Sequence, residues 1–196
     1  MTKVLKTPIE VSARHIHLTQ DHVDVLFGAG YQLKNKRELS QKGYFVAEER
    51  VEVVGNKSAM SLGILTPLRS QTQIEISITD AFKLGIEPCM RMSGDLAGST
   101  GCVLRGPKGE LTLKEGVIVA KRHIHMNDKL AKEHGISDHD EVSVKIEGER
   151  GLTFDHVVVR TDPTFDITMH IDTDEGNAIY AKCSSTYGIV IKKESV

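Results

Sequence analysis

The chain has 196 residues, a length that suits one large domain or two small ones, either of which can bury a core. Its 25 lysines and arginines nearly balance 27 aspartates and glutamates, which argues against a nucleic-acid-binding or membrane-binding surface. No apolar run reaches the length of a membrane span and the first residues lack the apolar region of a secretory signal, so we expect a cytoplasmic protein.

The first predicted strand, Val4 to Ser12, is short and β-branched and leads into Arg14-His15-Ile16-His17. Alternate side chains of a strand point to the same face, so His15 and His17 project together. Imidazole is the commonest protein ligand of zinc, and a catalytic zinc takes three protein ligands and keeps one open position. We interpret the pair as part of a metal site that needs another ligand, the alternative being two ordinary polar strand residues.

A helix is predicted next, because Thr19 has the character of an N-cap and residues 20–27 carry an apolar face that stops at Gly28. The polar and basic segment Tyr31 to Gly43 is expected to be a solvated loop, with a phosphate-holding loop as the alternative. Strands are then predicted at residues 45–54 and 62–65.

The segment Arg69 to Ser77 contains a candidate ligand. In a strand, Ile74 and Ile76 would face the core and Glu75 would face the other way. A carboxylate there could supply the missing oxygen ligand, and the guanidinium of Arg69 suits a bidentate oxyanion. A surface ion pair is the alternative interpretation.

The middle of the chain contains Ser93 to Gly101, a segment rich in small residues that permits close backbone approach to a ligand or forms a plain flexible turn. Before it, Thr79 and Asp80 are expected to cap a short helix, and after it Gly106 to Gly109 predicts a hairpin turn. The cysteines have no C-x-x-C spacing, which excludes a thiolate zinc site or disulfide framework and predicts reduced thiols at Cys89, Cys102 and Cys183. Strands are predicted at residues 89–92, 102–105 and 110–113.

The Arg-His-Ile-His phrase occurs a second time, at Arg122-His123-Ile124-His125, again at the end of a predicted strand, residues 117–120. Core packing does not account for this repetition, which favours a metal function for both pairs. A helix, a Gly-Ile turn and a strand follow the second pair at residues 128–146 and echo residues 79–92. These two internal repeats predict two small, related β-rich units.

His170 lies in the last predicted strand, residues 165–171, beside the acidic run Asp172 to Glu175. It is the candidate third nitrogen for one metal, with a structural histidine as the alternative. A further strand is expected at residues 154–160, and we place His22, His134, His139 and His156 at the surface.

Together these motifs resemble the phosphate propanoyltransferase family, the phosphotransacylases associated with propanediol-using bacterial microcompartments. The resemblance runs from about Val11 to Ala178. It is carried by the two Arg-His-Ile-His phrases and by residues 67–77, 93–99 and 169–178.

The resemblance implies a mainly β protein with two small β-barrel domains, capped by short helices, and an active site between them. One domain would comprise residues 14–120 and the other residues 1–13 with 121–196. Two zinc ions are implied, one held by His15, His17 and Glu75 and the other by His123, His125 and His170. Arg69 would be the catalytic phosphate-binding residue, and Ser12, Ser93 and Asn177 would line the coenzyme A or phosphate side.

The implied activity is that of a zinc-dependent phosphate acyltransferase, which interconverts propanoyl-CoA or acetyl-CoA plus phosphate with acyl phosphate plus coenzyme A by direct attack of phosphate on the thioester. We also expect a homodimer with no nucleic-acid or membrane partner. Microcompartment members carry an N-terminal extension, whereas ten residues precede Val11 here, so we expect a cytoplasmic form and leave microcompartment association open. The alternatives are a dinuclear metallohydrolase and a non-catalytic, metal-binding microcompartment scaffold.

Overall fold

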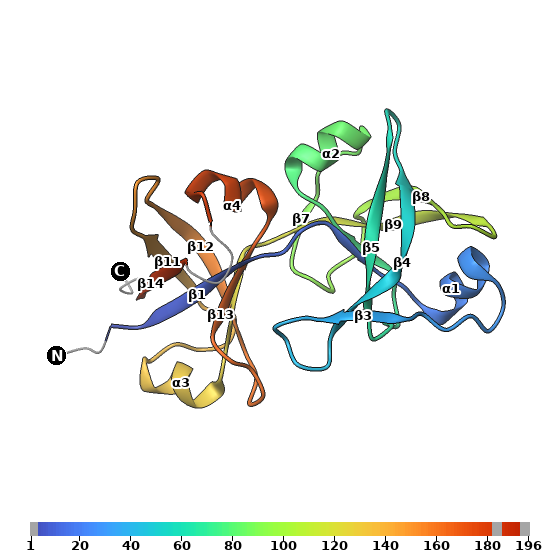
Figure 1. The fold of residues 1–196 in the computed structure, drawn as a ribbon. Coiled ribbons are helices and arrows are strands. Elements are labelled where there is room, and N and C mark those ends of the chain that lie inside the picture. The colour runs from blue at the N-terminus through green and yellow to red at the C-terminus, as the bar shows by residue number, and fades with distance from the viewer. Residues whose placement is uncertain (1–3, 182–185, 193–196) are drawn as a thin grey trace. The chain divides into compact units, whose positions relative to one another are not determined.

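The structure is a computed structural model that describes residues 4–181 and 186–192. The chain divides into two compact units. Unit 1 comprises Met1–Ser12 and Lys121–Val196, and unit 2 comprises Ala13–Ala120. The chain therefore passes from one unit to the other twice, each time just before an Arg-His-Ile-His phrase (Figure 1).

Unit 1 contains a closed barrel with the strand order β1-β13-β10-β12-β11-β14. Its strands are β1 (Lys6–Val11), β10 (His123–Met126), β11 (Glu141–Ile146), β12 (Leu152–Thr161), β13 (Thr168–Ile171) and β14 (Tyr187–Lys192). Two short helices accompany them, α3 (Asp128–Glu133) and α4 (Thr173–Ile179).

Unit 2 closes in the same way, because β8 pairs with both β4 and β9 and completes a ring in the order β4-β5-β2-β6-β9-β8. β3 extends the sheet from β4, and β7 pairs with β9. The strands are β2 (His15–His17), β3 (Asn35–Glu38), β4 (Phe45–Val54), β5 (Ala59–Thr66), β6 (Gln73–Glu75), β7 (Met90–Arg91), β8 (Thr100–Arg105) and β9 (Glu110–Ala120). The helices are α1 (Gln20–Phe27) and α2 (Ile78–Leu84). The expectation of a mainly β protein with two barrels and short helices is confirmed.

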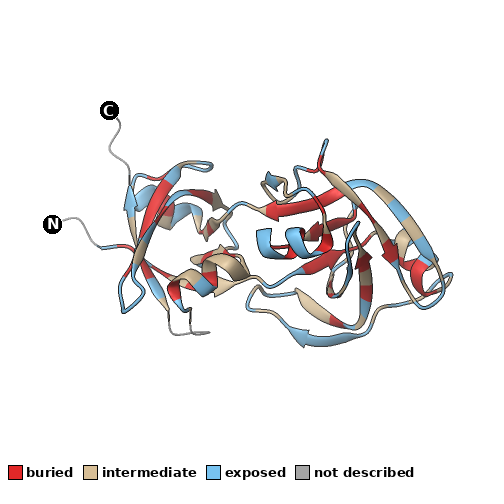
Figure 2. Cartoon of the chain, turned by 90° about the horizontal axis from the view of Figure 1, so that it is seen from above, coloured by how far each residue is buried: buried red, intermediate tan, exposed pale blue. Residues whose placement is uncertain are grey.

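Each barrel has its own apolar core, visible as buried positions along the strands in Figure 2. The isoleucine between the two histidines of each His-Ile-His strand lies in that core, since Ile16 and Ile124 are both 0% exposed. Full burial of an isoleucine contributes about 1.5–3 kcal/mol. The isoleucine thus fixes which face of the strand enters the core, and the histidines project from the opposite face.

The two barrels share one pairing pattern. β2 is parallel to β5 and antiparallel to β6, and β10 is parallel to β12 and antiparallel to β13. β9 is parallel to β6 in unit 2, and β1 is parallel to β13 in unit 1. The strand that precedes each His-Ile-His strand in sequence therefore belongs to the other unit. β1 precedes β2 but lies in unit 1, and β9 precedes β10 but lies in unit 2.

Most predicted elements are present, but β14 was not predicted, and the two strands predicted at residues 110–113 and 117–120 form the single strand β9. Four other differences concern caps, bounds and short elements. The expected cap of α2 at Thr79 and Asp80 is wrong, because Ser77 is the N-cap and Asp80 completes a capping box with it. The last predicted strand begins at Thr168 instead of residue 165, and the polar loop after α1 contains β3. α4 was not predicted from its acidic start, although Asp172 and Glu175 form another capping box there.

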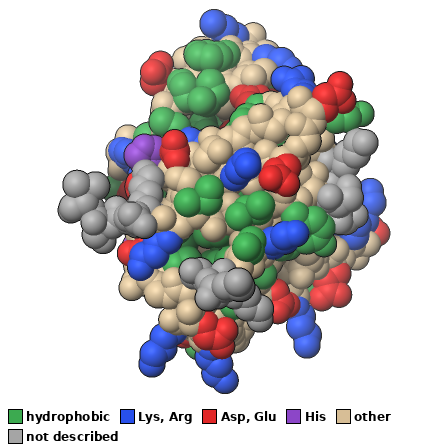
Figure 3. Space-filling model, turned by 90° about the vertical axis from the view of Figure 1, so that its left-hand side faces the viewer, with side chains coloured by type: hydrophobic (Ala, Val, Ile, Leu, Met, Phe, Trp, Pro, Cys, Tyr) green, Lys and Arg blue, Asp and Glu red, His purple; other side chains and the backbone are tan. Residues whose placement is uncertain are grey.

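Cys102 is buried and Cys89 is half-buried, and both are free thiols, whereas Cys183 lies outside the described residues. None of the helices in the described ranges is long and apolar enough to span a membrane. On the face seen in Figure 3, lysine and arginine side chains are interspersed with aspartate and glutamate.

Candidate metal-binding clusters

Unit 2 brings together the side chains of His15, His17 and Glu75, which we call the carboxylate cluster. His15 lies directly opposite Glu75 across the antiparallel pair β2 and β6. One ligand atom of each residue lies within 4.8 Å of those of the other two. Both histidines are buried, with His15 8% and His17 2% exposed. Two imidazoles and one carboxylate from adjacent strands form the ligand set of a three-ligand zinc site.

The proton positions in this cluster favour a cation. His15 Nδ1 lies 2.9 Å from the carbonyl oxygen of Ala13, and this contact requires the proton on Nδ1. His15 Nε2 then directs its lone pair towards Glu75 Oε2, 3.6 Å away. Two acceptor atoms at this separation repel each other unless a proton or a metal ion lies between them.

His17 also presents a free lone pair. Its pKa is lowered to about 2, chiefly by burial and to a smaller extent by the electrostatic influence of the neighbouring His15 and Arg69 side chains, so the imidazole is neutral at ordinary pH. Its Nδ1 is buried and has no hydrogen-bond partner among the described residues. An orphaned buried nitrogen is uncommon, and a metal ligand is one explanation for it. The carboxylate cluster therefore fits a divalent metal ion.

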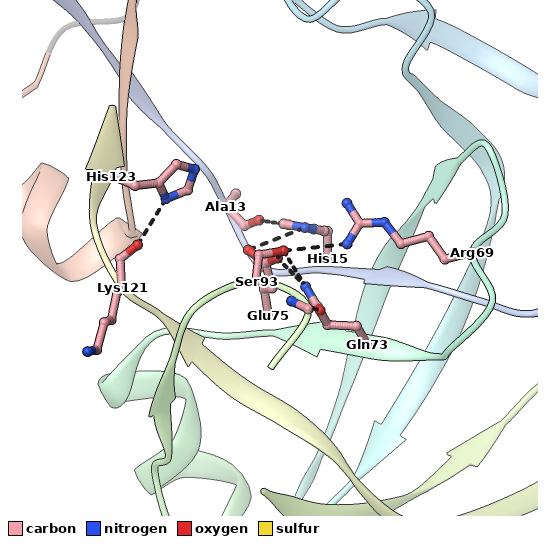
Figure 4. A network of polar contacts seen from close by, with 9 residues as sticks. Ala13, His15, Arg69, Gln73, Glu75, Ser93, Lys121 and His123 are labelled. Atoms are coloured by element: carbon pink, nitrogen blue, oxygen red, sulfur yellow. Dashed lines mark hydrogen bonds and ion pairs between the residues drawn. The ribbon is translucent and has the colours of Figure 1, made fainter. Parts of the chain in front are cut away.

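A polar network surrounds Glu75 (Figure 4). Gln73 Nε2 donates to Glu75 Oε1 at 2.5 Å and to Ser93 Oγ at 2.8 Å. Ser93 Oγ donates to Glu75 Oε1 at 3.2 Å and accepts from Arg69 Nη1 at 3.5 Å. A hydroxyl has one proton and two lone pairs, which matches one donated and two accepted bonds. Ser93 thereby links the candidate phosphate-binding guanidinium to the candidate metal ligand.

Unit 1 brings together three imidazoles, His123, His125 and His170, which we call the imidazole cluster. Their ring centroids are 4.9 Å apart for His123 and His125, 5.3 Å for His123 and His170, and 4.8 Å for His125 and His170. His123 lies directly opposite His170 on β13, as His15 lies opposite Glu75. Phe165 stacks on His125 with a centroid distance of 4.2 Å.

The imidazole cluster shows similar electrostatics. His123 Nδ1 lies 2.9 Å from the carbonyl oxygen of Lys121, which again assigns the proton to Nδ1. The pKa of His125 is lowered to about 4 by burial and by the nearby charges of His123 and Arg160, so its lone pair is available near neutral pH. Three imidazoles form the other common ligand set of a zinc site with an open position.

The arginine before each histidine pair has the same role in the two units. Arg14 Nε bonds Asp80 Oδ2 at 2.7 Å, and Arg122 Nη1 bonds Glu175 Oε1 at 3.0 Å. Asp80 and Glu175 are the capping-box carboxylates of the helices that follow Glu75 and His170. Each arginine thus ties its histidine strand to the helix that follows the third candidate ligand.

Sequence reasoning missed several neighbours of the two clusters. A capping-box pattern could have indicated Asp80 and Glu175. Gln73 and Arg160 carry no local signal, because their roles depend on the strand register. His22 and His134 were expected at the surface but are half-buried. His22 Nδ1 lies 2.7 Å from Thr72 Oγ1, and burial lowers the pKa of His22.

The remaining predicted site residues are spread over both units. Ser93 joins the carboxylate cluster in unit 2. In unit 1, Ser12 is half-buried and its backbone N–H donates to the carbonyl of Ile171, whereas Asn177 is exposed on α4.

The fold and the clusters define a protein of two related six-stranded barrels, each carrying a His-Ile-His strand opposite a third potential metal ligand. Residues 8–182 match the family model for phosphate propanoyltransferase. The chain belongs to the phosphate propanoyltransferase family.

Relatives with this name are similar over most of their length. The chain is 48% identical to the phosphate propanoyltransferase of Lachnoclostridium phytofermentans over 185 residues, covering 93% of this chain and 86% of the relative. It is 49% identical to that of Listeria monocytogenes over 193 residues, with 97% and 90% covered. It is 48% identical to that of Thermotoga maritima over 172 residues, with 87% and 82% covered.

Proposed function

We propose that this protein is a zinc-dependent phosphate acyltransferase that interconverts a short-chain acyl-CoA and phosphate with an acyl phosphate and coenzyme A. Membership of the phosphate propanoyltransferase family supports the acyl transfer to phosphate. The observation that carries the proposal is the network that joins Arg69 through Ser93 to Glu75 beside His15. Propanoyl and acetyl groups differ by one methylene, which a pocket discriminates weakly, so both are proposed as substrates.

The reaction transfers the acyl group in one step. A phosphate oxygen attacks the thioester carbonyl, the carbon–sulfur bond breaks as the new carbon–oxygen bond forms, and the proton of hydrogen phosphate ends on the released thiol. The main obstacle is the charge of the nucleophile, which must be neutralised and oriented before it reaches the carbonyl.

The carboxylate cluster would hold one zinc ion and the imidazole cluster the other. When bound, zinc supplies a Lewis acid that stabilises negative charge on the carbonyl oxygen and on the departing thiolate. The neutral state of His17 and His125 keeps their lone pairs available for this role.

Arg69 would bind the phosphate. Arg69 is half-buried and its Nη1 lies 3.5 Å from Ser93 Oγ, and a planar guanidinium matches two phosphate oxygens. Ser12, Ser93 and Asn177 would contribute polar contacts to coenzyme A or phosphate.

No protein nucleophile is proposed. Burial raises the pKa of the Cys102 thiol to about 12, so this thiol is protonated and unreactive at neutral pH. Direct attack by phosphate is therefore preferred to an acyl-enzyme at this cysteine.

The proposal is tested by following free thiol after mixing propanoyl-CoA with the purified protein, with and without phosphate. Release that requires phosphate and produces acyl phosphate is expected. Release without phosphate would indicate a metallohydrolase, and no release in either case would indicate a scaffold. Either of these results contradicts the proposal.

A matched pair of arginine variants sharpens the assay. Arg69→Ala is expected to lose about 100-fold or more in turnover, as expected when a group that stabilises transition-state charge is removed. Arg105→Ala removes an exposed arginine paired with Glu52 and Glu110, and it should retain wild-type turnover.

A further inference from the structure

Gln73 is a buried polar residue next to the carboxylate cluster. It lies on β6 two residues before Glu75, so both side chains share one face of the strand, and it lies opposite His17 on β2. Its exposed fraction is 1%. A buried amide is costly unless its oxygen and its N–H groups have partners.

The partners of Gln73 fix the orientation of its amide. The backbone N–H of Gly94 donates to Gln73 Oε1 at 2.8 Å. A backbone N–H can only donate, so the amide oxygen faces Gly94 and the amide nitrogen faces Glu75 and Ser93. Glu75 Oε1 is therefore occupied as an acceptor, while Oε2 is the oxygen that faces His15 Nε2 at 3.6 Å.

We infer that Gln73 is a positioning residue of the carboxylate cluster. It holds Glu75 Oε1 so that Oε2 is presented beside the imidazoles, and it holds Ser93, the hydroxyl that accepts from Arg69, against the same carboxylate. This inference rests on the proposed function, because it assigns Gln73 a role that acts through Glu75 and Ser93. Removal of such a supporting hydrogen bond typically weakens metal affinity about 10- to 100-fold.

The equivalent position of unit 1 provides an internal comparison. Thr168 lies opposite His125 on β13, as Gln73 lies opposite His17 on β6. A threonine side chain is too short to repeat the double contact of a glutamine amide. A substitution of Gln73 should therefore lower the metal affinity of the carboxylate cluster and leave that of the imidazole cluster unchanged.

Cobalt(II) titration tests the inference directly. Metal-free protein is titrated with cobalt(II) and the visible absorption of the bound ion is followed for wild type and Gln73→Met, which keeps the side-chain length and removes the amide. Wild type is expected to bind two ions. Gln73→Met should bind one ion with unchanged affinity and the other about 10- to 100-fold more weakly. Repeating the titration in a His123→Ala background isolates the carboxylate cluster.

Gln71→Met is the matched control, because Gln71 is exposed and precedes β6 by two residues. It should bind cobalt(II) as wild type does. A folded Gln73→Met protein that binds both ions with wild-type affinity would overturn the inference, as would an equal loss in Gln71→Met.

Gln73→Asn provides a second variant if Gln73→Met does not fold. It keeps an amide but shortens the side chain by one methylene, so the amide cannot reach both Gly94 and Glu75, and a loss of about 10- to 100-fold in one affinity is expected. Unchanged affinity in a folded Gln73→Asn protein would overturn the inference. Wild-type protein that binds no cobalt(II) would instead contradict the proposed function, so the two failures are distinguishable.

Discussion

Glu75 and His170 occupy equivalent positions in the two barrels, each directly opposite the first histidine of a His-Ile-His strand. The two barrels thus offer one pattern with different chemistry, a carboxylate in unit 2 and an imidazole in unit 1. A carboxylate ligand cancels one charge of a divalent ion, whereas a neutral imidazole cancels none. The two proposed zinc sites, each taken as the ion with its three ligands, would therefore differ in net charge.

Glu75→Ala and His170→Ala are each expected to reduce bound zinc from about two ions per chain to about one, because a zinc site with two protein ligands lacks the usual three. Zinc per chain is measured by atomic emission after removal of loose metal. His156→Ala, which changes an exposed histidine paired with Glu141, should keep both ions. Full zinc content in both cluster variants would contradict the assignment.

Arg14→Ala is expected to destabilise the protein by about 3 kcal/mol, because it leaves a buried carboxylate without its cation. Asp80 is 1% exposed, its Oδ2 accepts a hydrogen bond from Arg14 Nε, and its Oδ1 lies 2.7 Å from Arg14 Nη2 as an ion pair. The free energy of unfolding is measured with urea. Arg105→Ala breaks an exposed ion pair and should cost less than about 1 kcal/mol. Equal losses of unfolding free energy in the two variants would contradict the expectation that an ion pair with a buried carboxylate stabilises the protein more than an exposed ion pair.

Deletion of residues 1–12 should disrupt the imidazole cluster, although these residues immediately precede His15 in sequence. β1 pairs with β13 and β14, so its loss opens the barrel of unit 1 beside His170. Limited proteolysis is expected to cut unit 1 first, and zinc content should fall to about one ion per chain. Preferential cleavage in unit 2 would contradict this expectation.

Cys102 should resist thiol reagents in the native protein. Its pKa is raised to about 12 by burial, and the reactive thiolate is therefore scarce at any pH well below that value. Mass spectrometry after labelling at pH 8 should find Cys102 modified only in the presence of denaturant. Native labelling of Cys102 as fast as that of the half-buried Cys89 would contradict the role of burial.

Local signals predicted the elements that depend on neighbouring residues. α1 begins after Thr19 and ends before Gly28, as its N-cap and glycine indicate, since capping involves backbone groups within one helical turn. α2 shows the limit of this reasoning. Thr79 has the right chemistry for an N-cap, but the N-cap is Ser77. Ser77 lies three residues before Asp80, which is the spacing that a capping box requires.

Contacts between distant segments could not be read from periodicity. The alternation around Glu75 predicts which face it occupies, but its place opposite His15 depends on the register of β2 and β6. Gln73 and Ser93 are twenty residues apart in sequence and meet only because the loop after β7 returns to β6. Family resemblance supplied the candidate ligand sets, whereas this supporting network became visible only in three dimensions.

Metal removal and restoration test the central claim most directly. The protein is stripped with a chelator, and phosphate-dependent release of coenzyme A from propanoyl-CoA is measured before and after zinc is returned. We predict that the metal-free protein is folded and inactive and that activity rises with zinc until about two ions per chain are bound. Full phosphate-dependent activity in protein shown to contain no metal would contradict the account.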